Sequence, residues 1–126
     1  MLPPQHKTVI MTYFITEAQR KPTHSTCFFE FQKGTPKKQG GDRFWKEDSL
    51  LLHMDVFDQL NLYAVFNTIL PDFDYYGETT VTIDQYKSLK AAAFAQGGEI
   101  AIVFSELDIW ATECFKTESC FTIQGI

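Results

Sequence analysis

The segment ETTVTIDQYKSLKAAAFAQGG, residues 78–98, decides the fold class. Its first five residues are rich in threonine and valine, a composition typical of a strand. Thr82 and Gln85 have the spacing of a capping box, which starts a helix. An alanine run favours the helix, and Gly97 is placed to end it. The segment therefore predicts a strand that leads directly into a helix from Ile83 to about Ala95.

The residues after this helix fit two structures. Alternation of Ile100, Ile102 and Phe104 would suit a strand. A helical period fits a longer apolar set: Ile100, Val103, Phe104, Leu107, Ala111 and Cys114. We favour the helix because this period continues unbroken through Trp110. The final stretch FTIQGI, Phe121–Ile126, is a short strand candidate that can return to the sheet.

Upstream, the N-terminal third predicts two or three antiparallel strands. Three segments carry the β-branched and aromatic residues of strands: Lys7–Ile15, Ser25–Gln32 and a short strand opened by Phe44 and Trp45. A two-residue period places Phe29 and Phe31 on one face of the second strand and Phe28 and Glu30 on the other. The polar stretches Glu17–Thr23 and Lys33–Asp42 read as a connection and a loop.

The segment Asp48–Leu70 is mostly apolar and aromatic. Asp55 can cap a helix that begins at Val56. Two short helices fit the pattern as well as one, and Pro71 ends the segment. Asp72–Gly77 then reads as a turn. The whole chain, residues 1–126, is thus predicted to be a single α+β domain. Its small antiparallel sheet, of N-terminal strands plus a C-terminal strand, packs against two to four helices from the C-terminal two-thirds.

Composition supports one stable domain. The 126 residues are 44% hydrophobic and 15% aromatic, enough to bury a core without disulfides. The three cysteines lack C-x-x-C spacing, so we expect reduced thiols. The apolar runs are too short for a membrane helix, and the N-terminus is a poor secretory signal. We therefore expect a cytoplasmic protein with no membrane association.

Charge is distributed unevenly along the chain. The net charge is −5, yet residues 1–47 carry +4 and residues 48–126 carry −9. A negative surface over the C-terminal two-thirds would attract basic partners and repel nucleic acid. Ordinary solubilising charge is the alternative interpretation.

The residues that could perform catalysis or bind a metal are scattered. No G-x-S-x-G motif is present, and Cys27 with His24 is only a local pair. Metal sites need clustered ligands, but His6, His24 and His53 lie far apart in sequence, and His53 with Asp55 alone does not make a site. The pairs Asp55/Asp58 and Asp72/Asp74 are more simply helix-cap and turn residues than acid–base pairs. We therefore predict that the protein is not an enzyme and needs no cofactor or metal.

Two surface clusters could bind a macromolecule. A basic–aromatic cluster suits nucleic acid: Lys33, Lys37, Lys38, Arg43, Phe44, Trp45 and Lys46. The net negative charge argues against that use, so no nucleic-acid partner is predicted. An acidic–aromatic cluster suits a basic protein, because tyrosine is favoured at interfaces. It gives our predicted partner-binding residues: Asp72, Asp74, Tyr75, Tyr76 and Glu78.

The stretch PDFDYYG at residues 71–77, followed by ETTVT and a helix, resembles small bacterial immunity proteins of polymorphic-toxin and contact-dependent growth inhibition systems. The ending FTIQGI, after a helix containing Trp110, is similar to theirs. The resemblance covers residues 48–126. It implies a cognate protein toxin with a basic C-terminal toxin domain as partner, inhibited by occlusion of its active site. A small-ligand or regulatory module with an aromatic-lined interior is the alternative function, and an enzyme of unrecognised type is a third.

Overall fold

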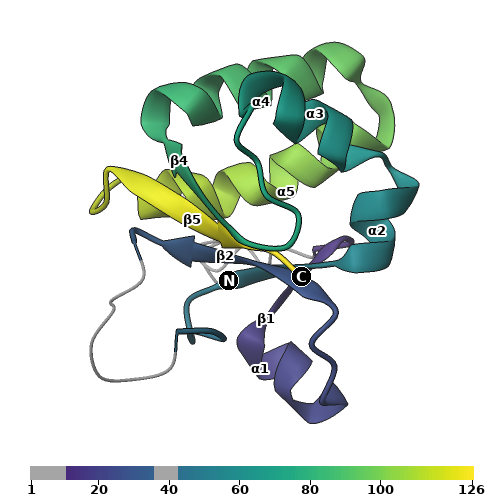
Figure 1. Cartoon of the computed structure of the whole chain (residues 1–126), viewed down its shortest axis with the longest axis vertical. Helices are drawn as coiled ribbons and strands as arrows, with labels where there is room; N and C mark the ends of the chain where they lie inside the picture. Colours follow the sequence, from purple (N-terminus) through teal and green to yellow (C-terminus); the bar gives the residue numbers. More distant parts are fainter. Residues whose placement is uncertain (1–10, 36–42) are drawn as a thin grey trace, which may run out of the picture.

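A computed structural model describes residues 11–35 and 43–126 (Figure 1). Within them, five strands form one antiparallel sheet in the order β1-β3-β2-β5-β4. The strands are β1 (Phe14–Thr16), β2 (Phe28–Lys33), β3 (Leu50–His53), β4 (Glu78–Thr82) and β5 (Cys120–Gln124). The C-terminal strand β5 lies between β2 and β4, so it joins the N-terminal strands to the strand predicted from residues 78–82. The α+β prediction is confirmed.

Five α-helices and one 3-10 helix occur in the described residues. They are α1 (Glu17–Arg20), the 3-10 helix η1 (Lys21–Thr23), α2 (Met54–Gln59), α3 (Leu62–Ile69), α4 (Ile83–Gln96) and α5 (Gly98–Cys114). Figure 1 shows α3, α4 and α5 on one face of the sheet and α1 beyond the other face. We call the second of these the outer face. No helix in the described ranges combines the length and apolar character needed to cross a membrane.

The segment that decided the fold class adopts the predicted structure. The backbone N–H of Gln85 donates to Thr82 Oγ1 at 3.3 Å, and Thr82 N–H donates to Gln85 Oε1 at 2.9 Å. Gly97 follows the last turn of α4 with φ +69°. The next helix, α5, confirms the helical interpretation of the ambiguous stretch that includes residues 99–104.

The predicted strand at Phe44 and Trp45 is wrong, because the third strand is β3. Trp45 has φ +63°, in the left-handed region, which a strand does not accommodate. Strand β3 was hidden in sequence because Leu50, Leu51 and Leu52 are all buried, so the run does not alternate.

Other boundaries also differ from the predictions. The first strand covers Phe14–Thr16, and residues 7–10 of the predicted strand lie outside the described residues, as do 36–42 of the predicted loop. The predicted connection Glu17–Thr23 forms α1 and η1, started by a capping box between Thr16 and Gln19. His53, rather than Asp55, caps α2, since its Nδ1 accepts the Asp55 N–H at 3.0 Å. The interpretation as two short helices is confirmed by α2 and α3.

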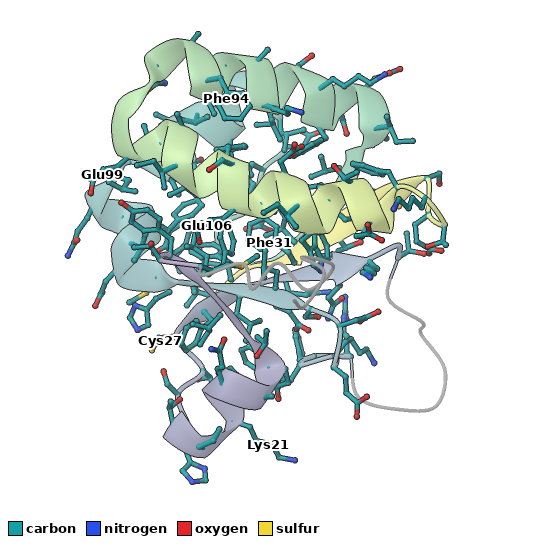
Figure 2. The ribbon with its side chains drawn as sticks, turned by 180° about the vertical axis from the view of Figure 1, so that it is seen from behind. Lys21, Cys27, Phe31, Phe94, Glu99 and Glu106 are labelled. Atoms are coloured by element: carbon teal, nitrogen blue, oxygen red, sulfur yellow. The ribbon has the colours of Figure 1, made fainter. Side chains whose placement is uncertain are left out.

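The core lies between the sheet and the helices and is largely aromatic. Phe29 and Phe31, which were predicted to share one face of the strand, both point into it. The ring of Phe31 packs edge-on against Phe14 at 5.5 Å and against Trp110 at 6.4 Å, between centroids. Figure 2 places Phe31 beneath α5. Burying such rings supplies much of the stability of a domain this size.

A buried carboxylate ties α5 to the first strand. Glu106 is 6% exposed and accepts the backbone N–H groups of Thr12, Tyr13 and Phe14 at 3.0, 3.0 and 3.2 Å. Figure 2 shows its position on α5. Three donors compensate for burying this side chain, so Glu106 fixes the edge of the sheet.

Candidate binding surface

The turn between α3 and β4 is held by the end of β5. Gly125 N–H donates to the Gly77 carbonyl at 2.6 Å, and Ile126 N–H donates to the Tyr75 carbonyl at 2.8 Å. A Cβ at position 125 would collide with the Tyr75 carbonyl oxygen and lie 2.9 Å from the Gly77 nitrogen. Glycine at 125 therefore permits the close approach that positions Tyr75 and Tyr76.

Tyr75, a predicted partner-binding residue, is built into the fold. Its half-buried ring packs edge-on against Phe29 at 5.0 Å, and its hydroxyl donates to Asp58 Oδ1 at 2.9 Å. Burial, followed by this hydrogen bond, raises the pKa of Tyr75 to about 12. Tyr75 therefore connects the turn to α2 and stays a neutral phenol at physiological pH.

Tyr76 projects into solvent beside Tyr75. It is 77% exposed, and the two ring centroids are 4.8 Å apart. Asp74 Oδ1 accepts the Tyr76 N–H at 3.0 Å, which fixes the turn locally. We call Asp55, Asp58, Asp74, Tyr75 and Tyr76 the acidic–aromatic surface.

The carboxylates of this surface have no Lys or Arg partner within residues 11–35 and 43–126. None of Asp55, Asp58 and Asp74 forms an ion pair with a Lys or Arg of the described residues. Asp55 lies 3.6 Å from His53 Nδ1. Their negative charge is thus directed to solvent, where a cationic surface could meet it.

The structure does not bring all five predicted residues together. Glu78 forms an ion pair with Arg43 across the outer face. Asp72 is exposed on the β4 side of the turn, where it lines a pocket of about 220 Å³ with Glu78 and Gln85. Asp58 and Asp55 of α2 take their place beside the tyrosines, because Tyr75 bonds to α2.

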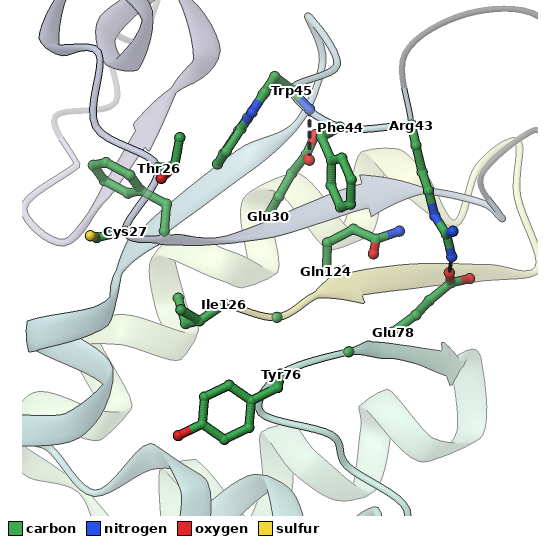
Figure 3. A pocket seen from close by; sticks show the side chains of 13 residues that line it. Thr26, Cys27, Glu30, Arg43, Phe44, Trp45, Tyr76, Glu78, Gln124 and Ile126 are labelled. Carbon is green, nitrogen blue, oxygen red and sulfur yellow. Dashed lines mark hydrogen bonds and ion pairs between the residues drawn. The ribbon is translucent and has the colours of Figure 1, made fainter.

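A groove of about 550 Å³ lies on the outer face next to Tyr76 (Figure 3). Its floor includes Glu30 and Gln124, and its apolar lining comes from Phe28, Phe44, Trp45, Tyr76 and Ile126. Arg43 and Glu78 close one end, as Figure 3 shows. Phe44 is 45% exposed and Ile126 is 36% exposed, so large apolar groups are left open to solvent.

The loop that forms the groove wall is held by a buried carboxylate. Glu30, 1% exposed, accepts Trp45 N–H at 2.7 Å, Lys46 N–H at 2.8 Å and the Ser49 hydroxyl at 2.6 Å. The Arg20 guanidinium carbon stacks 3.9 Å from the Trp45 ring centroid. These contacts hold Trp45 at a positive φ, a conformation that costs about 1–3 kcal/mol and persists only where the surrounding structure enforces it.

The acidic C-terminal two-thirds does not form one uniform negative face. Glu106 is buried, and Glu78 is paired with Arg43. Asp108 accepts the Tyr86 hydroxyl at 2.8 Å and pairs with Lys90 at 3.1 Å. Glu113 pairs with Lys116 at 2.7 Å, which lowers the pKa of Glu113. Of the twelve carboxylates in residues 48–126, one is thus buried and three are paired with a Lys or Arg. The carboxylates of the acidic–aromatic surface are among those that have no Lys or Arg partner in the described part of the chain.

The groups considered for catalysis are dispersed in the structure. Within residues 11–35 and 43–126, no three His, Cys, Asp or Glu side chains are placed to hold a metal ion. Cys27 is an exposed thiol on the groove rim, whereas Cys114 and Cys120 are buried free thiols. Burial raises the pKa of Cys114, so that thiol is held in its unreactive form.

Comparisons with protein-family models, with curated proteins and with solved structures found no match to this chain.

Sequence reasoning missed the groove. Its wall residues Arg43, Phe44 and Trp45 were assigned to a nucleic-acid cluster or a strand. The signal that could have found it is Glu30, a charged residue in the middle of the apolar strand FFEF. A buried carboxylate needs several donors, and in this chain two of them are backbone groups of the groove wall.

Proposed function

We propose that the protein is a cytoplasmic immunity-type inhibitor that binds a basic toxin domain and occludes its active site. The observation that carries the proposal is the acidic–aromatic surface, with three carboxylates that no described Lys or Arg pairs and an exposed tyrosine among them. Carboxylates on this surface would replace the phosphate groups that a nuclease-type toxin binds. Tyr76 would supply contact area at little entropic cost.

The proposed partner is the C-terminal domain of a large secreted protein encoded beside the gene for this chain. Co-expression with that domain should restore growth, and the purified proteins should form a complex whose affinity falls steeply with added salt. Toxicity that co-expression does not relieve, with no complex at low salt, would exclude this function.

A double variant, Asp55→Asn with Asp74→Asn, tests the surface itself. Asparagine keeps an oxygen that can accept the Tyr76 N–H, so the turn should survive while two charges are lost. We expect affinity for the toxin domain to fall at least tenfold, about 1.4 kcal/mol. The matched control, Glu47→Gln with Glu118→Gln, removes two exposed charges outside the surface and should leave affinity nearly unchanged.

A small-ligand module is the second candidate, and the groove is the observation that favours it. Its volume of about 550 Å³ falls in the range of small-molecule pockets, roughly 300–1,000 Å³. A defined small molecule that copurifies with the protein, detected by native mass spectrometry and lost in Tyr76→Ala, would favour this function over inhibition of a toxin.

A further inference from the structure

We propose that the groove on the outer face receives one large apolar side chain, of Phe or Leu size, from a segment of the partner that carries Lys or Arg on both sides of it. This inference rests on the proposed function and specifies which chemistry of the cationic partner is recognised.

We expect an apolar side chain in the groove because the carboxylates that line it already have hydrogen-bond or ion-pair partners. Glu30 accepts three hydrogen bonds, and Glu78 is paired with Arg43. A cation in the groove would meet carboxylates that already have partners, with the Arg43 guanidinium close by. Phe44, Tyr76 and Ile126 in contrast leave 45%, 77% and 36% of their surface exposed. The groove therefore offers apolar contact more than charge.

We expect Lys or Arg on both sides of that apolar residue because the acidic–aromatic surface adjoins the groove. Tyr76 belongs to both the groove and the acidic–aromatic surface, with its ring 4.8 Å from that of Tyr75. Tyr75 in turn bonds to Asp58. A segment whose apolar residue enters the groove would thus place its neighbours near Asp58 and Asp74, which no described Lys or Arg pairs.

The groove is also held in shape before binding. The wall is fixed by Glu30 and by the stack of Arg20 on Trp45, and the opposite rim is fixed by the backbone bonds of Gly125 and Ile126 to the turn. Preformed walls reduce the entropic cost of binding, and a strained backbone at Trp45 is typical of functional sites.

The test uses the full chain and three synthetic peptides: acetyl-Lys-Lys-Phe-Lys-Lys-amide, the same peptide with Ala in place of Phe, and acetyl-Glu-Glu-Phe-Glu-Glu-amide. Binding is measured by NMR titration, following the Trp45 indole N–H. We expect the Lys–Phe peptide to bind at least fivefold more tightly than either of the others and to shift the Trp45 signal.

Two matched variants locate the effect. Phe44→Ala removes a groove wall, whereas Phe94→Ala removes a ring of similar exposure, 42%, on α4. We expect the preference for Phe over Ala peptide to disappear in the first variant and to persist in the second. Equal binding of the Phe and Ala peptides, or a preference that survives Phe44→Ala, overturns the groove proposal. Equal binding of the Lys- and Glu-flanked peptides overturns its cationic part.

Failure of this proposal is distinct from failure of the proposed function. If the peptides do not distinguish Phe from Ala but the toxin domain is neutralised through Asp55 and Asp74, the groove proposal is wrong and the inhibitory function stands. If the toxin domain is not bound at all, the inhibitory function is wrong whatever the peptides show.

Discussion

The two faces of the sheet are buried by different means. The face under the helices is covered by apolar side chains, with Phe29, Phe31 and Phe121 fully buried. The outer face carries the buried polar residues Glu30, Gln32, Thr122 and Gln124. Three of them hydrogen-bond to loops: Glu30 accepts from the Trp45 and Lys46 N–H groups, Gln32 Nε2 donates to the Arg43 carbonyl at 2.7 Å, and Thr122 Oγ1 donates to the Gly34 carbonyl at 2.7 Å. Gln124 Nε2 donates to Gln32 Oε1 at 3.3 Å.

Strand β2 contributes side chains to both faces of the sheet. Alternate residues of β2 point to opposite sides, so Phe29 and Phe31 enter the core while Glu30 and Gln32 face the loops. Apolar packing is non-directional and mainly stabilises the domain. Hydrogen bonds are directional, so the outer face can hold Trp45 and its neighbours in one conformation around a groove. Substitutions on the face under the helices should therefore mainly lower stability, whereas substitutions on the outer face should also change the conformation of the groove wall.

The largest effect is expected on the helical face. Phe31→Ala removes a ring that is 0% exposed and packed between Phe14 and Trp110. We expect the free energy of unfolding to fall by about 3–5 kcal/mol, measured by urea denaturation. Phe44→Ala on the outer face should cost less than about 1 kcal/mol, since that ring is 45% exposed. Similar losses in both variants would contradict the distinction between the faces.

A smaller but more local effect is expected at Glu30. Glu30→Ala leaves the donors of Trp45, Lys46 and Ser49 without their acceptor. We expect a loss of about 2–3 kcal/mol, together with a change in the NMR signals of the Trp45 indole while those of Trp110 stay in place. An unchanged Trp45 environment would show that Glu30 does not hold the groove wall.

Gly125→Ala tests the attachment of the turn to β5. The added Cβ would meet the backbone of Tyr75 and lie 2.9 Å from the Gly77 nitrogen. We expect a loss of about 1–2 kcal/mol and a shift of the Tyr75 and Tyr76 signals. In Gly77→Ala the three atoms nearest to the Cβ belong to the Asp74 side chain, which can shift more easily than backbone, so the effect should be smaller. An unchanged free energy of unfolding in Gly125→Ala would contradict the close approach of residue 125 to the backbone of Tyr75.

The smallest effect at neutral pH is expected from Tyr75→Phe, which removes one hydrogen bond to Asp58 and should cost about 1 kcal/mol or less. The pKa of Tyr75 is raised from 10.0 to about 12, so folding favours the neutral phenol. Its stabilising contribution is therefore complete below pH 10 and declines as pH rises toward 12. Alkaline titration at 295 nm should show the wild-type and variant curves separating near pH 12. Separation near pH 10 would contradict burial of this phenol.

Several elements were predictable because their signals are local. The capping box of Thr82 and Gln85, the α5 period and the alternation of β2 each depend on neighbouring residues. The third strand could not be predicted in this way, because β3 is buried on both faces and its sequence therefore lacks the two-residue period. The turn with Tyr75 and Tyr76 was recognised, but its connection to Asp58 joins residues 17 positions apart.

The amino-acid sequence by itself determined the α+β class, the strand–helix unit at residues 78–96 and which residues share a face of β2, because periodicity and capping act over a few residues. Only the tertiary structure decided which carboxylates remain unpaired and where the groove lies. Pairs such as Arg43 with Glu78, and the bonds of Glu106 to residues 12–14, join positions 35 or more apart in the chain. Electrostatic and hydrogen-bonding partners depend on distance in space, which local patterns do not encode.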